Sequence, residues 1–166
     1  MISSILYATD LGLYSPYVLQ HALSLARAFN AGLYVVHAVE PMGLFAESVL
    51  QTYLDEERLQ ELRSKGLSTV MASIEQRVLE GFSDELGETV HERDLIRAVR
   101  VVHGDPPVAI LEEAQKLGVD LLVVGSHSHG TEWDIPLGRT AGRLVQLSEV
   151  PVYLVPMLQH RSRGEL

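Results

Sequence analysis

The sequence predicts an α/β protein with an open, five-stranded parallel sheet and helices on both faces. Five short, nearly continuous apolar runs alternate with longer segments whose apolar residues recur every three or four positions. Strands that alternate with helices are typical of a parallel sheet, and parallel strands buried on both faces are apolar throughout. The chain has 166 residues, which is long enough for one full hydrophobic core. We therefore expect residues 1–166 to form a single domain with right-handed crossovers.

The apolar runs are interpreted as strands because each is short and is bounded by turn residues. In chain order they span residues 4–9, 33–39, 97–103, 121–124 and 150–155. The carboxyl ends of parallel strands meet at one edge of the sheet, and ligands bind there where the winding reverses. Functional residues are therefore expected just after the strands: Thr9 and Asp10, Val39 and Glu40, His103 and Gly104, and Gly125 onward.

Two helices carry clear start signals. Ser15 precedes Pro16, which combines a capping hydroxyl with a proline at the first helical position. Gly32 is expected to stop that helix. Asp105 and Pro106 give the same combination of cap and proline before the next helix. We interpret Asp105 as a helix cap and assign it no ligand.

The remaining segments are assigned from periodicity and polarity. Apolar spacing predicts a long helix over roughly 54–81 and a last helix over 138–147. Residues 42–53 are ambiguous and resemble a lid-like segment, and the polar residues 83–94 are expected to form a loop.

The composition restricts the classes of function. A net charge of −9 disfavours nucleic acid and anionic lipid as general partners. The chain has no cysteine, which excludes disulfides, thiolate catalysis and cysteine zinc sites. No apolar run approaches the ~18 residues of a membrane span, and residues 1–4 lack the basic start of a signal peptide. We expect a cytoplasmic protein that does not insert into membranes.

Residues 121–143 read as a buried strand, a glycine-flanked loop and the N-terminus of a helix. This layout favours an anion site, because unpaired backbone N–H groups and the helix dipole point at one place. Arg139 and Arg143 gather positive charge there, at a helix end where cations are unfavourable. A bound anion or a nearby carboxylate would offset them. The alternative interpretation is that both arginines are solvated and pair with Glu132, Asp134 or Glu149.

Taken together, these segments resemble the universal stress protein family over nearly the whole chain. The segments that carry the resemblance are Ala8-Thr9-Asp10, His37 with Val39, Gly104-Asp105-Pro106, Leu117-Gly118-Val119-Asp120, Val123-Val124-Gly125-Ser126-His127 and Val150-Pro151-Val152-Tyr153-Leu154-Val155. The resemblance implies a Rossmann-like sheet, similar to the adenine nucleotide alpha hydrolases, with strand order 3-2-1-4-5. It also implies a homodimer that pairs through the last strand, 150–155.

Members of this family that bind ATP carry a motif of Gly, two residues, Gly, nine residues, Gly, and then Ser or Thr. Gly125 and Gly138 match the first and third glycines, whereas Ser128 replaces the second and Arg139 replaces the hydroxyl residue. Ser128 adds a Cβ where a backbone would approach a phosphate. Arg139 is a strong phosphate donor of different geometry, and Thr140 offers a hydroxyl one residue late.

The resemblance implies that an adenine nucleotide, ATP in the first instance, lies across the ends of the first and fourth strands. Asp10 would contact the nucleotide or its Mg²⁺, and Val39 would line the adenine side. The residues assigned to the nucleotide are Thr9, Asp10, Val39, Val124, Gly125, Ser128, Gly138, Arg139 and Thr140. Asp10 as a plain strand-end carboxylate, and the valines as core residues, remain alternatives.

Signatures of catalysis and of a resident metal are missing. The sequence contains no P-loop, no dinucleotide fingerprint and no nucleophile elbow. His127 and His129 match no zinc signature and are interpreted as locally hydrogen-bonded loop residues. The sequence therefore favours a dimeric binding module, regulated by nucleotide, that acts on an unknown protein partner. A stress protein without nucleotide that works through protein contacts, and a slow nucleotide hydrolase, are the alternatives.

Overall fold

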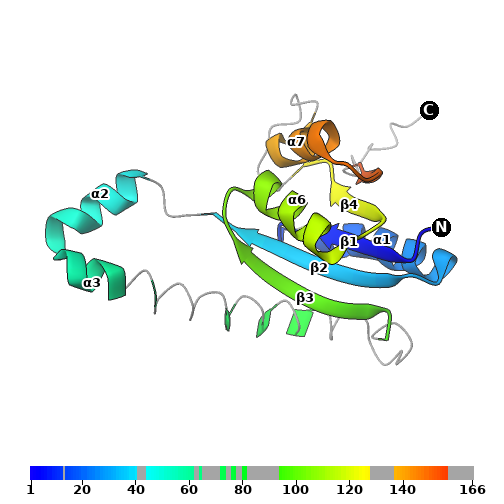
Figure 1. The fold of residues 1–166 in the computed structure, drawn as a ribbon, viewed down its shortest axis with the longest axis horizontal. Helices are drawn as coiled ribbons and strands as arrows, with labels where there is room; N and C mark the ends of the chain where they lie inside the picture. The colour runs from blue at the N-terminus through cyan, green and yellow to red at the C-terminus, as the bar shows by residue number, and fades with distance from the viewer. Residues whose placement is uncertain are drawn as a thin grey trace, which may run out of the picture.

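The computed structural model describes residues 1–12, 14–40, 44–61, 64, 72–73, 76–77, 80–81, 94–127 and 137–156. Within these residues one sheet has five strands, all parallel, in the order β3-β2-β1-β4-β5 (Figure 1). The strands are β1 Ser4–Ala8, β2 Gly32–Val39, β3 Ile96–His103, β4 Leu121–Gly125 and β5 Val152–Val155. This topology confirms the expected fold class and strand order. β1 lies at the centre, and β3 and β5 are the two edges.

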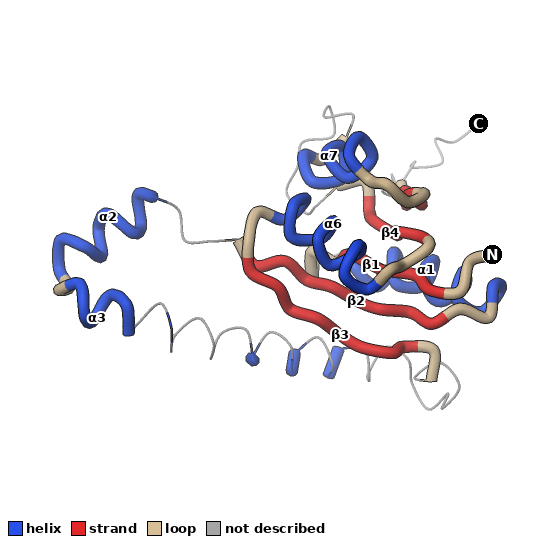
Figure 2. The backbone as a smooth tube through the Cα atoms, in the orientation of Figure 1, coloured by secondary structure: helices blue, strands red, loops and turns tan. Residues whose placement is uncertain are grey.

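Helices cover both faces of the sheet. The principal helices are α1 Ser15–Phe29, α2 Leu44–Tyr53, α3 Glu56–Glu61, α6 Pro106–Leu117 and α7 Arg139–Leu147. Buried residues of α1 form one core cluster with the sheet, and buried residues of α6 and α7 form the other. Figure 2 shows α2 and α3 set apart from the sheet, beyond the carboxyl end of β2. None of the helices in the described ranges has the length and apolarity needed to cross a bilayer.

Side-chain alternation along β1 builds both cores. Ile5 and Tyr7 are buried with α1, whereas Leu6 and Ala8 are buried with α6 and α7. Successive strand residues point to opposite faces, so a central strand that is covered on both sides must be apolar at every position. Because all five strands are parallel, their carboxyl ends lie together at one end of the sheet.

The start of α1 differs from the prediction. Ser15 is the first residue of the helix, and Tyr14 occupies the N-cap position without a side-chain capping bond. The Ser15 hydroxyl instead lies 3.1 Å from the hydroxyl of Tyr7 and 2.9 Å from Oγ1 of Thr9. The Ser15 hydroxyl, which the sequence predicted to cap the helix, therefore bonds to two buried polar side chains, Tyr7 in β1 and Thr9 directly after it.

The end of α1 was also predicted wrongly. Asn30 ends the helix in the left-handed conformation, with φ 52° and ψ 44°, and its N–H reaches the carbonyls of Ala26 and Arg27. Asparagine tolerates this conformation better than most residues. Gly32 is already the first residue of β2 and donates to the carbonyl of Ser3 at 3.0 Å. α6, in contrast, ends at left-handed Gly118.

The two ambiguous middle segments are only partly described. Residues 44–53 of the lid-like segment form α2. Of the helix predicted over 54–81, α3 and the residues 72–73, 76–77 and 80–81 are helical. The rest of that helix, and the loop predicted over 83–94 apart from its last residue, lie outside the described residues.

Candidate functional site

A cavity of about 590 Å³ lies at the carboxyl ends of β1, β2 and β4. Its walls also include the first turns of α1, α6 and α7. The volume falls in the range of about 300–1,000 Å³ that small-molecule sites occupy. From β1 the chain first continues to β2 and β3 on one side, and then crosses to β4 and β5 on the other side. The winding therefore reverses at β1, and a ligand crevice is expected there.

Seven of the nine residues assigned to a ligand from sequence line this cavity. They are Thr9, Asp10, Val124, Gly125, Gly138, Arg139 and Thr140. Ser128 lies outside the described residues. Val39 is not among the lining residues, although its neighbours Ala38 and Glu40 are. The carbonyl of Val39 accepts from the N–H of Gly104 at 3.0 Å, which ties this residue to β3 rather than to β1.

The turn after β1 is held by its own side chains. Oγ1 of Thr9 accepts from the N–H of Leu11 at 3.1 Å, and Oδ1 of Asp10 accepts from the N–H of Gly12 at 2.8 Å. Leu11 has a φ of 58°, a conformation that costs a non-glycine residue about 1–2 kcal/mol. The two bonds offset that strain, and they hold the exposed Asp10 carboxylate at the cavity rim.

Hydroxyl groups connect the cavity floor to α1. The buried Tyr7 donates its hydroxyl to the carbonyl of Ser15 at 3.1 Å, and the Ser15 hydroxyl meets Thr9. Tyr7 and Ser15 both line the cavity. Sequence reasoning missed them, because Tyr7 looked like an ordinary strand residue and Ser15 looked like a helix cap.

His37 is a further lining residue that the sequence did not assign. Its Nδ1 lies 2.8 Å from the carbonyl oxygen of Thr9. A carbonyl only accepts, so Nδ1 carries the proton in this bond. The contact joins the end of β2 to the turn after β1. In the described part of the chain, no three histidine, aspartate or glutamate side chains gather closely enough to hold a metal ion.

Gly125 and Gly138 lie where a side chain would have little room. A Cβ on Gly138 would lie 3.0 Å from the carbonyl oxygen of Ser126, and one on Gly125 would lie 3.2 Å from a methyl group of Val18. The N–H of Gly138 donates to the same Ser126 carbonyl at 2.8 Å. The start of α7 is thus fixed against the end of β4, so that its first N–H groups lie beside the cavity.

Arg139 pairs with a carboxylate that the sequence did not predict as its partner. Its Nη2 lies 3.3 Å from Oδ1 of Asp105, and the two side chains are 76% and 47% exposed. Asp105 occupies the N-cap position of α6, and Pro106 opens that helix as predicted, but the Asp105 side chain makes no capping bond. The nearby carboxylate that we expected to offset the charge of Arg139 is thus Asp105, at the N-terminus of α6. Nearby, Nδ1 of His127 lies 2.8 Å from the hydroxyl of Ser126.

Comparison with protein families gives a consistent result. The model of the universal stress protein family matches residues 1–156. The chain is 28% identical over 161 residues to universal stress protein YxiE of Bacillus subtilis (strain 168), covering 93% of this chain and 99% of that protein. It is 30% identical over 96 residues to universal stress protein Rv2319c of Mycobacterium tuberculosis (strain ATCC 25618 / H37Rv), covering 58% of this chain and 30% of the relative.

Solved structures have the same fold. Hypothetical protein MJ0577 superposes with a TM-score of 0.71 at 22% identity, covering 96% of this chain and 99% of that one. Universal stress protein UspA from Lactobacillus plantarum superposes with a TM-score of 0.57 at 17% identity, covering 93% and 97%. At these identities the likeness concerns the fold.

Proposed function

Because the chain belongs to the universal stress protein family, we propose that its cavity binds an adenine nucleotide, with ATP as the first candidate. Binding would regulate contacts with another protein and would have no catalytic purpose. The observation that carries this proposal is the cavity itself, since it joins seven residues assigned to a nucleotide from sequence alone.

The two ends of the cavity suit the two ends of a nucleotide. At the β4–α7 end, Arg139, Thr140 and the first N–H groups of α7 offer donors to phosphate. At the β1–β2 end, the apolar side of Ala8 and Ala38 offers space for a base beside the polar Thr9 and His37. Asp10 supplies carboxylate oxygen, which suits the Mg²⁺ of a metal–nucleotide complex.

Two further structures of this fold support the ligand class. One is a universal stress protein in complex with cAMP, with a TM-score of 0.54 at 18% identity. The other is the universal stress protein from Archaeoglobus fulgidus in complex with dAMP, with a TM-score of 0.51 at 20% identity. Both ligands contain adenine and a single phosphate group, so adenine nucleotide is the class we propose for this chain.

The test is to ask what the purified protein carries and what it binds. Protein is denatured, and the supernatant is separated by anion exchange with mass detection. Calorimetry with Mg-ATP then measures affinity for wild type, Asp10→Ala and Arg139→Ala. We expect each substitution to weaken binding by about tenfold or more, since each removes a charged contact. Glu149→Gln, at the opposite edge of the sheet, is the control and should bind like wild type. No released nucleotide and no heat up to millimolar Mg-ATP would overturn the proposal.

We further propose that the module is a cytoplasmic homodimer that pairs through β5. This edge strand hydrogen-bonds to β4 on one side, and its Leu154 is 37% exposed. Val145 and Leu147 of α7, which packs against β5, are exposed as well. An apolar edge strand favours a partner strand. The same exposed residues favour the second candidate function, a stress protein that works through protein contacts without nucleotide.

A further inference from the structure

The ion pair between Arg139 and Asp105 joins the N-termini of α7 and α6 at the side of the cavity. We propose that Asp105 is a specificity-determining residue, which weakens the binding of phosphate ligands in proportion to their charge. In the absence of Mg²⁺, the cavity would then favour a nucleoside monophosphate over the corresponding triphosphate. This inference rests on the proposed function, and it concerns which nucleotide the site prefers.

The charges around the cavity carry the argument. Among the described residues that line it, Arg139 is the sole lysine or arginine, whereas Asp10 and Glu40 contribute two carboxylates. Asp105, 3.3 Å from Arg139, adds a third carboxylate beside this guanidinium. Counting Asp105 with the described lining residues, and leaving histidines aside, a phosphate chain therefore meets side-chain charges that sum to a negative value. Each additional phosphate charge adds repulsion from the same carboxylates.

The Asp105 side chain contacts Arg139 instead of capping its own helix. It stands at an N-cap position, where aspartate normally accepts a bond from the N–H groups of the first turn. Here it makes no such bond and lies against Arg139 instead. The pair is exposed, and exposed pairs are weak. A phosphate can therefore take Arg139 from Asp105, because arginine–phosphate bonds are charge-assisted and often bidentate. The carboxylate then remains beside the phosphate without its partner.

The experiment measures the dissociation constants of AMP, ADP and ATP by calorimetry, in EDTA and low salt, for wild type and Asp105→Asn. Asparagine is chosen because it is as good an N-cap residue as aspartate. We expect Asp105→Asn to tighten ATP binding by about fivefold, ADP less and AMP least. The gain should shrink at 0.5 M NaCl, since exposed charges are screened (Debye length about 4 Å at that salt). When Arg139→Met is also present, all three nucleotides should bind more weakly, but Asp105→Asn should still tighten ATP most and AMP least.

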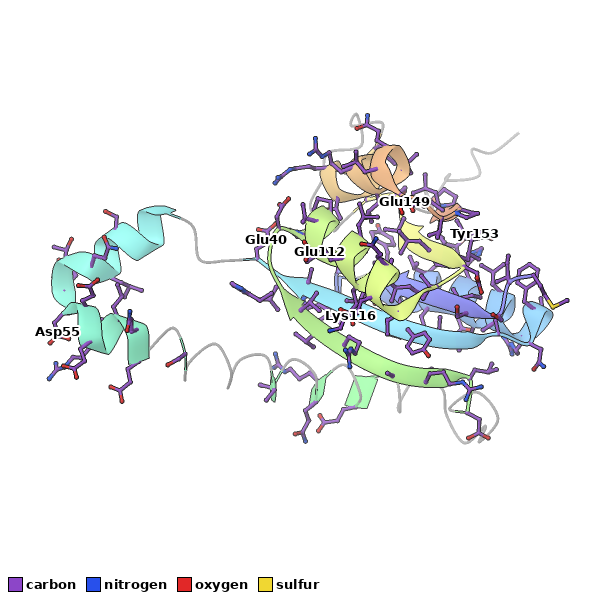
Figure 3. The ribbon with its side chains drawn as sticks, in the orientation of Figure 1. Glu40, Asp55, Glu112, Lys116, Glu149 and Tyr153 are labelled. Atoms are coloured by element: carbon purple, nitrogen blue, oxygen red, sulfur yellow. The ribbon has the colours of Figure 1, made fainter. Side chains whose placement is uncertain are left out.

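Glu149→Gln is the matched control, because it removes one negative charge beyond the far end of α7. Figure 3 labels Glu149 near β5 and Glu40 beyond the carboxyl end of β2, toward opposite ends of the sheet. We expect Glu149→Gln to leave the ratio of ATP to AMP affinity within twofold of wild type. If Glu149→Gln raised the ratio of ATP to AMP affinity as much as Asp105→Asn does, the cause would be the net charge of the protein, and the proposed role of Asp105 would be wrong.

Failure of the inference is distinguishable from failure of the proposed function. If nucleotides bind but Asp105→Asn leaves the ATP to AMP ratio unchanged, or tightens all three equally, the inference is wrong and the proposed function stands. If no nucleotide binds, the proposed function is wrong, and inorganic tripolyphosphate becomes the probe. Tighter tripolyphosphate binding by Asp105→Asn than by wild type would still support the role of Asp105. Equal binding, or none, would overturn it.

Discussion

Asp120 fastens the amino ends of β1 and β4, at the opposite edge of the sheet from the cavity. Its Oδ2 accepts from the backbone N–H groups of Ser3 at 2.9 Å and Ser4 at 3.0 Å. The hydroxyls of the same serines lie 2.9 and 3.2 Å away. The bond from the Ser3 N–H, followed by those from the Ser3 hydroxyl and the Ser4 N–H, lowers the pKa of Asp120 from 3.8 to about 2.

This lowered pKa predicts a pH-dependent loss of stability in Asp120→Asn. A carboxyl group whose pKa is lower in the folded state than in the unfolded state stabilises the protein above the unfolded value. That contribution disappears as the pH falls through the folded value. We expect Asp120→Asn to be less stable than wild type above about pH 4 and to converge with it toward pH 2. Urea unfolding followed by circular dichroism from pH 2 to 7 checks this, with the exposed Asp94→Asn as control. A difference in unfolding free energy between wild type and Asp120→Asn that does not vary with pH would contradict this prediction.

Some of the residues assigned to a ligand could be placed at the cavity from their position in the chain. Thr9 and Gly125 were expected there as strand ends, and Gly125 and Gly138 from the glycine motif that the family resemblance implies; all three line the cavity. The partner of Arg139 was not predictable in this way. Asp105 lies 34 positions earlier, and only the packing of α6 beside α7 brings the two together. From its position before Pro106, Asp105 was instead predicted to cap its own helix.

At the scale of elements, one ion pair links α6 to the edge strand β3. Nε of Arg100 lies 2.9 Å from Oε1 of Glu113. The Arg100 side chain is 42% exposed, whereas that of Glu113 is 6% exposed. The two partners are therefore not equivalent, because only the arginine reaches water when the contact is lost.

The asymmetry predicts unequal effects of the two single substitutions. Arg100→Met leaves a buried carboxylate without its partner and should lower the free energy of unfolding by about 3 kcal/mol. Glu113→Gln keeps an oxygen acceptor and leaves the arginine partly solvated, so we expect a loss of about 1–2 kcal/mol. Urea titration of both variants measures the difference. If Glu113→Gln proved the more damaging of the two, the argument from burial would be wrong.

Element boundaries show where local signals compete. All five strands were predicted within two residues at each end, since continuous apolar runs leave few alternatives for a strand buried on both faces. The sequence did not determine where α1 ends, because Asn30 and Gly32 both tolerate a left-handed backbone and stand two positions apart. Once Gly32 is needed to pair with Ser3, Asn30 must end the helix.

At the scale of the whole molecule, the side of β5 that pairs with no described strand predicts the state of association. We expect wild type to elute at twice the chain mass in size-exclusion chromatography with light scattering. Leu154→Arg places a charge on the edge strand and should give a monomer at low micromolar concentration. Phe29→Arg, an exposed apolar residue at the end of α1, should remain dimeric. A monomeric wild type, or a dimer that survives Leu154→Arg, would refute pairing through this strand.

The order of the strands illustrates what the sequence alone does not determine. Alternating strands and helices indicate a parallel sheet, but the pattern is the same whichever strand lies at the centre. The order 3-2-1-4-5 was expected from the family resemblance, and the structure confirms it. The cavity follows from this order, since the reversal between β2 and β4 beside β1 opens the crevice.

This order also has a consequence for the newly made chain. β1 leaves the ribosome before the other four described strands, yet Ser3 must wait for Asp120, 117 positions later, to complete its contacts. At elongation rates of about 5–20 residues per second, that interval is on the order of ten seconds. Throughout it, the apolar edge of β1 that will face β4 has no partner. Biosynthesis of this protein therefore includes a long interval in which its most buried strand is accessible to chaperones and to other nascent chains.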